Sequence, residues 1–142
     1  MKTRTLVLTL LALALIFAAP APETALARDH SDQYYAAKQL SPKAGAVVKS
    51  GDVVRIEWES AFPNVDLSMC ETELLISLDH GNTYTYISSQ RNPKIRYFNW
   101  TVPQVPAGAP VLAILDIRFG CLNVFPETYS PQIEYSFLIR AE

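Results

Sequence analysis

Three carboxylic acids, from the middle of the chain onward, are the residues best suited to acid–base chemistry. Glu71 and Glu73 are two positions apart, and Asp116 lies within a long apolar run. If neighbouring strands bring these side chains together, they form the kind of carboxylate pair that glycosidases use. A glycosidase also needs a deep cleft, which a chain this short rarely supplies. A Ser-His-acid triad is not indicated either, because the chain has no nucleophile-elbow motif. We therefore expect no catalytic residues and no enzyme activity.

Metal-binding side chains are also few. The chain contains 2 Cys and 2 His, with no C-x-x-C pair, so a zinc or copper site is not favoured. Asp79 and Asn82 are close enough in sequence to begin a calcium site, but a calcium ion takes about six to eight oxygen ligands and no others are apparent. His80 between them is expected to be an exposed turn residue. The sequence predicts no metal and no cofactor.

The N-terminal segment has the three parts of an export signal. Lys2 and Arg4 precede an uncharged apolar run at 6–19, and Ala25-Leu26-Ala27 offers a cleavage site before Arg28. The run is shorter than the roughly 20 residues that a membrane span needs. We expect residues 1–27 to be a signal peptide, the protein to be secreted or periplasmic, and no membrane span to remain after cleavage. An uncleaved N-terminal anchor is the alternative.

The charge of the chain indicates which classes of partner to expect, and its cysteines indicate the redox compartment. Lys2, Arg4 and Glu23 lie in the signal, so the remainder carries 10 basic and 13 acidic residues. With no basic patch, a nucleic-acid partner is not expected. Cys70 and Cys121 make the one possible pair, and in an exported protein such a pair most simply forms a disulfide. A reduced pair is the alternative.

Short apolar runs separated by turn residues predict an all-β domain. Residues 28–39 are polar and mixed and are expected to form a flexible leader, which leaves 40–142 as the folded domain. No long stretch has helical periodicity. The run at 111–119 is the most continuously apolar and should be a central strand. About seven strands at this spacing favour an antiparallel β-sandwich. They are expected at 40–48, 54–58, 74–78, 84–88, 97–102, 111–119 and 133–140.

One turn carries a recognisable motif. Ser77, Asp79, Gly81, Thr83 and Tyr84 have the spacing S-x-D-x-G-x-T-aromatic, which resembles the Asp-box of sialidases and other secreted β-proteins. In such a turn the aspartate accepts backbone hydrogen bonds, the glycine takes positive φ, and the aromatic ring covers the turn. The motif is structural, so it favours a secreted β-protein and is silent on the ligand.

Three further stretches resemble an immunoglobulin-like domain. Ser41-Pro42, with Gly45, Gly51 and Ile56-Glu57-Trp58 after it, is similar to the opening of that domain, 76–84 to its hairpin, and Asn99-Trp100-Thr101-Val102-Pro103 to a later strand. The family is the fibronectin III-like domain of secreted bacterial proteins and of fungal cell-wall glucan-assembly proteins. The resemblance covers about 40–140. It implies an Ig-like sandwich that serves as a spacer or binding accessory.

These features predict an exported, non-catalytic module that recognises a protein or a cell-surface ligand. The expected surface is the end where the disulfide joins the loops at 60–69 and 120–131, with Phe125 and Tyr129 at its centre. Tyr84 and Tyr86, on one strand, are a second aromatic surface that can stack on sugar rings. A carbohydrate-binding accessory domain, with a polysaccharide as its partner, is therefore the alternative function.

Overall fold

The computed structural model describes residues 34–142, which fold into nine strands and two short 3₁₀ turns. The predicted signal peptide and the first part of the predicted leader, residues 28–33, lie outside the described residues. The prediction of an all-β sandwich is confirmed, but the strand count is nine and not seven. The strands are β1 (Ala36–Ser41), β2 (Val47–Lys49), β3 (Val53–Ala61), β4 (Cys70–Ser77), β5 (Thr85–Gln90), β6 (Tyr97–Thr101), β7 (Val111–Cys121), β8 (Phe125–Thr128) and β9 (Phe137–Arg140). The 3₁₀ turns are η2 (Leu67–Met69) and η3 (Ile133–Tyr135).

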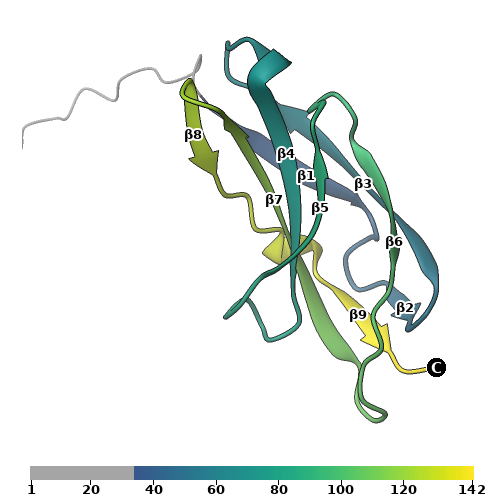
Figure 1. Ribbon diagram of the computed structural model, residues 1–142. Helices are drawn as coiled ribbons and strands as arrows, with labels where there is room; N and C mark the ends of the chain where they lie inside the picture. Colours follow the sequence, from purple (N-terminus) through teal and green to yellow (C-terminus); the bar gives the residue numbers. More distant parts are fainter. Residues whose placement is uncertain (1–33) are drawn as a thin grey trace, which may run out of the picture.

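The strands form two sheets that pack face to face (Figure 1). The smaller sheet has the order β1-β3-β6, and the larger one has the order β2-β9-β7-β4-β5, with β8 added beside β7. All pairs are antiparallel except β2 with β9. The apolar run at 111–119 belongs to β7, which lies in the middle of the larger sheet, as predicted.

Alternating side chains on both sheets build the core. From the smaller sheet Ile56, Trp58 and Trp100 point inward, and they meet Leu74 and Ile117 of the larger sheet. A second apolar cluster lies at the disulfide end, around Phe119. This division follows from the two-residue period of a strand, which sends alternate side chains to opposite faces. The outward faces are therefore free to carry other chemistry.

The prediction that residues 28–39 form a flexible leader is wrong for its last four residues. Residues 36–39 belong to β1, which pairs with β3 from Ala36 opposite Ala61 onward. Just before β1, the ring of Tyr35 is buried and stacks on Phe119, with 4.9 Å between the ring centroids. Strand β1 lies at the edge of the smaller sheet, where a partly polar segment can pair on one side only.

The single strand predicted at 40–48 is also wrong. The chain leaves the smaller sheet at Ser41 and enters the larger one at Val47, where β2 pairs in parallel with β9. Pro42 and the positive-φ residue Gly45 lie between the two strands. Both residues interrupt a strand, so the chain can change sheets at this point.

The long loop predicted at 120–131 contains a strand. Strand β7 continues to Cys121, the chain reverses through Asn123, which has a φ of +58°, and β8 returns along β7 with Phe125 opposite Cys121. The sequence did not predict this strand, because it is four residues long and contains Pro126. Proline is tolerated on an edge strand but not inside a sheet.

The predicted disulfide between Cys70 and Cys121 is confirmed. The two residues are directly opposite each other at one end of the β4–β7 pair. Both are buried beside Phe119, in the second apolar cluster. The bridge closes a loop of 51 residues and so limits the freedom of the unfolded chain.

Two buried glutamines close the gap between the sheets beside β1. The Gln132 side chain accepts a hydrogen bond from the backbone N–H of Gln39 at 2.8 Å and donates one to the carbonyl of Ala37 at 3.1 Å. The backbone N–H of Gln132 donates to the carbonyl of Leu115 on β7 at 2.7 Å. Gln132 therefore ties strand β1 of the smaller sheet to strand β7 of the larger one.

Replacing Gln132 by Leu should lower the free energy of unfolding by about 2–3 kcal/mol, because the buried N–H of Gln39 loses its acceptor and the carbonyl of Ala37 loses its shorter hydrogen bond. Gln104→Leu, at an exposed position, is the matched control and should change stability by less than about 0.5 kcal/mol. Urea unfolding of both variants measures the difference, and equal stabilities would contradict this role for Gln132.

Candidate functional site

The turn after β4 is held by side-chain hydrogen bonds. Asp79 accepts from the backbone N–H of Thr83 at 2.9 Å and from its hydroxyl at 2.6 Å. Ser77 donates its hydroxyl to Asp79 at 2.7 Å and accepts the N–H of Gly81 at 2.8 Å. These bonds stabilise the ionised carboxylate, and the Thr83 bonds contribute most to lowering the pKa of Asp79 to about 2. The turn therefore has a fixed shape.

The turn presents Tyr84 to the outer face of the larger sheet. Gly81 has a φ of +87°, and a Cβ atom at this position would lie 3.5 Å from the Tyr84 hydroxyl oxygen. His80 beside it also has positive φ, +62°, which is uncommon for a residue with a side chain. Burial and the nearby Asp116 carboxylate raise the pKa of Tyr84. The ring thus lies close to the charged centre of β7.

That charged centre is an ion pair on an otherwise apolar strand. Outward positions of β7 carry Asp116 and Arg118, two residues apart. Asp116 is only 2% exposed, and it accepts hydrogen bonds from Arg118 Nε at 2.7 Å and from the backbone N–H of Ser130 at 2.8 Å. Each carboxylate oxygen thus accepts one hydrogen bond, and Asp116 orients both Arg118 and the chain at Ser130.

Arg118 connects three segments of the outer face. Besides Asp116, its guanidinium contacts Glu127 of β8 at 3.2 Å. It also lies over the ring of Tyr129, 4.3 Å from the ring centroid. A cation over an aromatic face is an attractive contact, and stronger where water is partly excluded. Arg118 therefore holds β8 and Tyr129 in place on the sheet.

Tyr84 and Tyr129 line one hollow, which we name the tyrosine groove. Its volume is about 450 Å³. Both rings come from outside the strands that form its floor, Tyr84 from the 78–84 turn and Tyr129 from the segment after β8. The tyrosine groove is lined by His80, Gly81, Tyr84, Ile114, Asp116, Arg118, Tyr129, Pro131 and Ile133. Tyr129 and Ile133 are 59% and 63% exposed, so an apolar surface faces solvent here.

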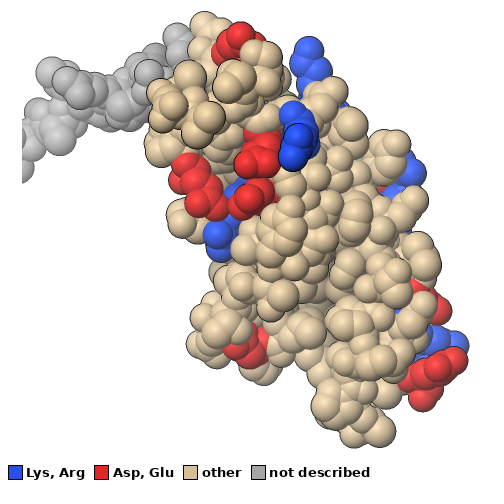
Figure 2. All heavy atoms as spheres, viewed as in Figure 1, with Lys and Arg blue, Asp and Glu red and all other residues tan. Residues whose placement is uncertain are grey.

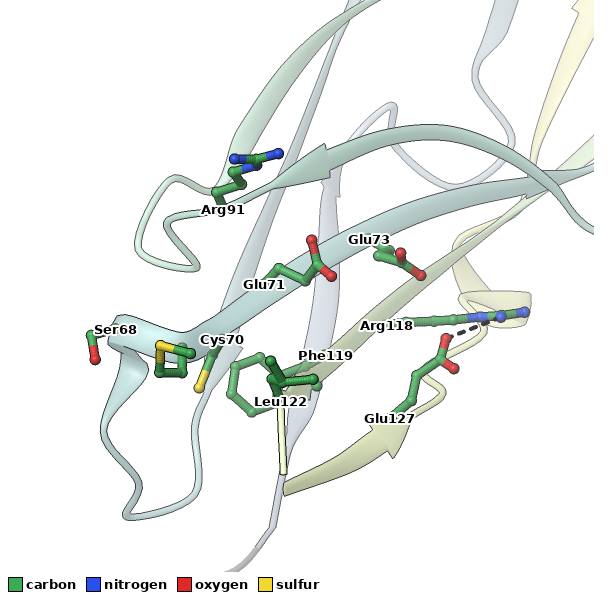
Figure 3. Close-up of a pocket in the computed structure, with 11 residues that line it drawn as sticks. Ser68, Cys70, Glu71, Glu73, Arg91, Arg118, Phe119, Leu122 and Glu127 are labelled. Atoms are coloured by element: carbon green, nitrogen blue, oxygen red, sulfur yellow. Dashed lines mark hydrogen bonds and ion pairs between the residues drawn. The ribbon is translucent and has the colours of Figure 1, made fainter. Parts of the chain in front are cut away.

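A second hollow, which we name the acidic hollow, is also lined by Arg118 and has a volume of about 580 Å³ (Figure 3). Glu71 and Glu73 project into it from β4, and Glu127 projects from β8 toward Arg118. Burial, followed by the charges of Glu127 and Glu71, raises the pKa of Glu73. Arg91 and the apolar side chains Met69 and Leu122 also line this space.

Charge is concentrated on one part of this face. Figure 2 shows acidic and basic groups gathered where β4, β7 and β8 run side by side, while the adjoining surface is largely uncharged. The acidic hollow belongs to this concentrated region. The tyrosine groove and the acidic hollow meet at Arg118, which lines both of them.

The other predicted binding residues lie elsewhere. Phe125 is half-buried, and its ring packs on Phe119 with the centroids 5.7 Å apart. Tyr86 is 54% exposed on β5, opposite Leu75, and lines neither hollow. Of the four residues proposed for the binding surface, the structure therefore brings together Tyr84 and Tyr129 and separates Phe125 and Tyr86 from them.

Sequence reasoning missed Arg118 and Ile133. The signal for Arg118 was present, because two charges spaced by two residues in an apolar strand must share one face. Ile133 had no such signal, since it belongs to a 3₁₀ turn within a segment that was expected to be a strand. Within residues 34–142, no three His, Cys, Asp or Glu side chains are grouped as a metal site requires. The same residues contain no helix with the length and hydropathy of a membrane span.

No protein-family profile matches this chain, and a search of curated proteins found no match.

Asp79→Asn should show a stability difference that depends on pH. The folded-state pKa of about 2 lies below the value of about 3.9 in an unfolded chain, so the carboxylate stabilises the fold above pH ~4 and this contribution is lost as the pH falls toward 2. The melting temperature of the variant should therefore be lower than wild type at pH 7 and converge with it near pH 2. Asp52→Asn, at an exposed turn position, is the control. A gap that persists unchanged at pH 2 would contradict the role assigned to Asp79.

Phe125→Ala should reduce the free energy of unfolding by about 2 kcal/mol, since a half-buried ring leaves the Phe119 cluster. Val124→Ala, at a neighbouring position that is 59% exposed, should cost less than about 0.5 kcal/mol. Thermal melting of the two variants tests this. If Phe125→Ala melts like wild type, the ring does not contribute to the core and is available to a partner.

Proposed function

We propose that this chain is an exported, non-catalytic binding module with an Ig-like sandwich, and that its ligand is a protein or a cell-surface component. The observation that carries the proposal is the tyrosine groove. Tyr84 and Tyr129 come from separate segments, yet both rings line one hollow on the outer face of the larger sheet. Aromatic side chains that stay exposed around a hollow are typical anchors of binding surfaces.

The framework beneath the groove supports a binding role. The Asp116–Arg118 pair and the Asp79 turn hold residues that line the groove. A site that is rigid before binding loses less conformational entropy when it takes up a ligand. The disulfide also supports an oxidising compartment outside the cytosol.

A carbohydrate is the second candidate ligand. Two tyrosine rings beside a hollow can stack on the faces of sugar rings, and polar groups of Arg118 and His80 line the same space. This arrangement suits a short oligosaccharide as well as a protein side chain. A glycan array incubated with residues 28–142 separates the two candidates.

Tyr129→Ala should abolish most ligand capture while leaving the fold intact, because the ring is largely exposed. With residues 28–142 immobilised and the native envelope fraction as the source of ligand, we expect a loss of about tenfold or more, typical of a binding hot spot. Tyr97→Ala is the matched control, since Tyr97 is a 46% exposed tyrosine on the smaller sheet. Equal capture by both variants and wild type would remove the groove as the binding site.

A further inference from the structure

The acidic hollow has a charge balance that favours a cation. Arg118 is already engaged by Asp116 and Glu127, so it leaves little positive charge for a ligand. Among the described residues, no ion pair neutralises Glu71 or Glu73. Arg91 supplies one positive charge across the hollow (Figure 3). The hollow therefore keeps an excess of carboxylate, which attracts a positively charged group.

The wall and the rim of the acidic hollow suit a long aliphatic side chain with a charged end. Met69 and Leu122 are 57% and 67% exposed, and the two segments that carry them are joined by the disulfide. At Gly120 a Cβ atom would come within 3.3 Å of the Glu127 backbone, so the absence of a side chain lets β8 approach β7 closely at this wall. Lys and Arg bury apolar stems while their charged ends find partners. The combination of apolar rim and carboxylates matches these side chains.

The two hollows adjoin at Arg118 on the outer face of β7. Outward positions run from Ile114 in the tyrosine groove, through Arg118, to Gly120 in the acidic hollow. Six residues of strand extend about 20 Å at roughly 3.3 Å per residue. An extended peptide of about six residues covers the same distance. A bound segment can thus occupy both hollows at once.

We propose that the occupant is an extended, basic segment of a partner protein. It lies along the outer face of β7, with an apolar or aromatic side chain in the tyrosine groove and a Lys or Arg side chain between Glu71, Glu73 and Glu127. This inference rests on the proposed function and specifies its ligand. The carboxylates select the basic residue, and the tyrosines select the apolar one.

A positional-scanning array of hexapeptides tests the proposal, with labelled residues 28–142 as the probe. Peptides that combine Lys or Arg near one end with an aromatic or branched apolar residue three to five positions away should be selected. Raising the salt concentration from low to high should weaken their binding, because exposed charges are screened. Selection of acidic peptides, or selection that is indifferent to charge, would overturn the proposal.

The variant Glu71→Gln/Glu73→Gln should bind the selected peptides about tenfold more weakly and lose the preference for Lys or Arg. Glu57→Gln/Glu59→Gln is the matched control, because it removes two glutamates with the same spacing from an outward face of the smaller sheet. Melting curves check that both variants fold. Unchanged binding by the Glu71 and Glu73 variant would overturn the proposal.

The failures of the two proposals are distinguishable. If capture depends on Tyr129 but not on Glu71 and Glu73, the basic segment is excluded and the tyrosine groove remains the binding site. If the glycan array yields a ligand that depends on Tyr129 and the peptide array yields none, the protein-segment proposal is overturned in favour of a carbohydrate. If Tyr129→Ala binds the selected peptides like wild type, the proposed function fails together with this inference.

Discussion

The pairing of β4 with β7 is the constraint on which the rest of the molecule depends. Eight consecutive residue pairs join the strands, from Cys70 opposite Cys121 to Ser77 opposite Ile114. In the observed register, Leu74 and Ile117 face the core, and Glu73 and Arg118 face outward. A shift by one residue would exchange these two faces, burying charge and exposing the core. The disulfide fixes the register at one end, and the Ser77–Asp79 turn follows directly from the other.

The Asp116–Arg118 ion pair on β7 fixes the shape of the outer face of the larger sheet. Asp116 is almost fully buried, and isolated burial of a carboxylate would be very costly. Arg118 and the Ser130 N–H compensate that cost, so the segment after β8 has one favourable position. Removing Arg118 alone would leave an unpaired buried charge, which typically costs about 3–5 kcal/mol. The main effect of the pair is to fix the position of Tyr129, which lies against the same guanidinium.

The segment that carries Tyr129 is held from the opposite side as well. Ser130 and Gln132 make backbone hydrogen bonds to Ile117 and Leu115 of β7, while the Gln132 side chain reaches β1 of the smaller sheet. One short stretch of chain thus closes the edge of the sandwich and forms a wall of the tyrosine groove. The site and the stability of the fold share these contacts, which explains how an exposed tyrosine keeps a defined position.

The sequence by itself determined the features that depend on local pattern. Alternation marked the inward faces of strands such as Val54–Trp58, continuous apolarity marked β7 as central, and the one possible cysteine pair indicated the disulfide. Each of these signals involves neighbouring residues or a choice between very few partners. The central strands and the disulfide could therefore be predicted without knowledge of the packing.

Only the tertiary structure decided which residues form the site. Strands β1 and β8 gain their order from long-range pairing and not from their own apolar content. The sequence therefore predicted a leader at the polar Lys38-Gln39 and a loop at the proline-containing Phe125–Thr128. Tyr84 and Tyr129 are far apart in the sequence, and they meet because β8 and the ion pair of Arg118 place the second ring. Phe125 lies apart from these two tyrosines because its ring packs on Phe119. These placements depend on contacts between distant segments, which local periodicity does not encode.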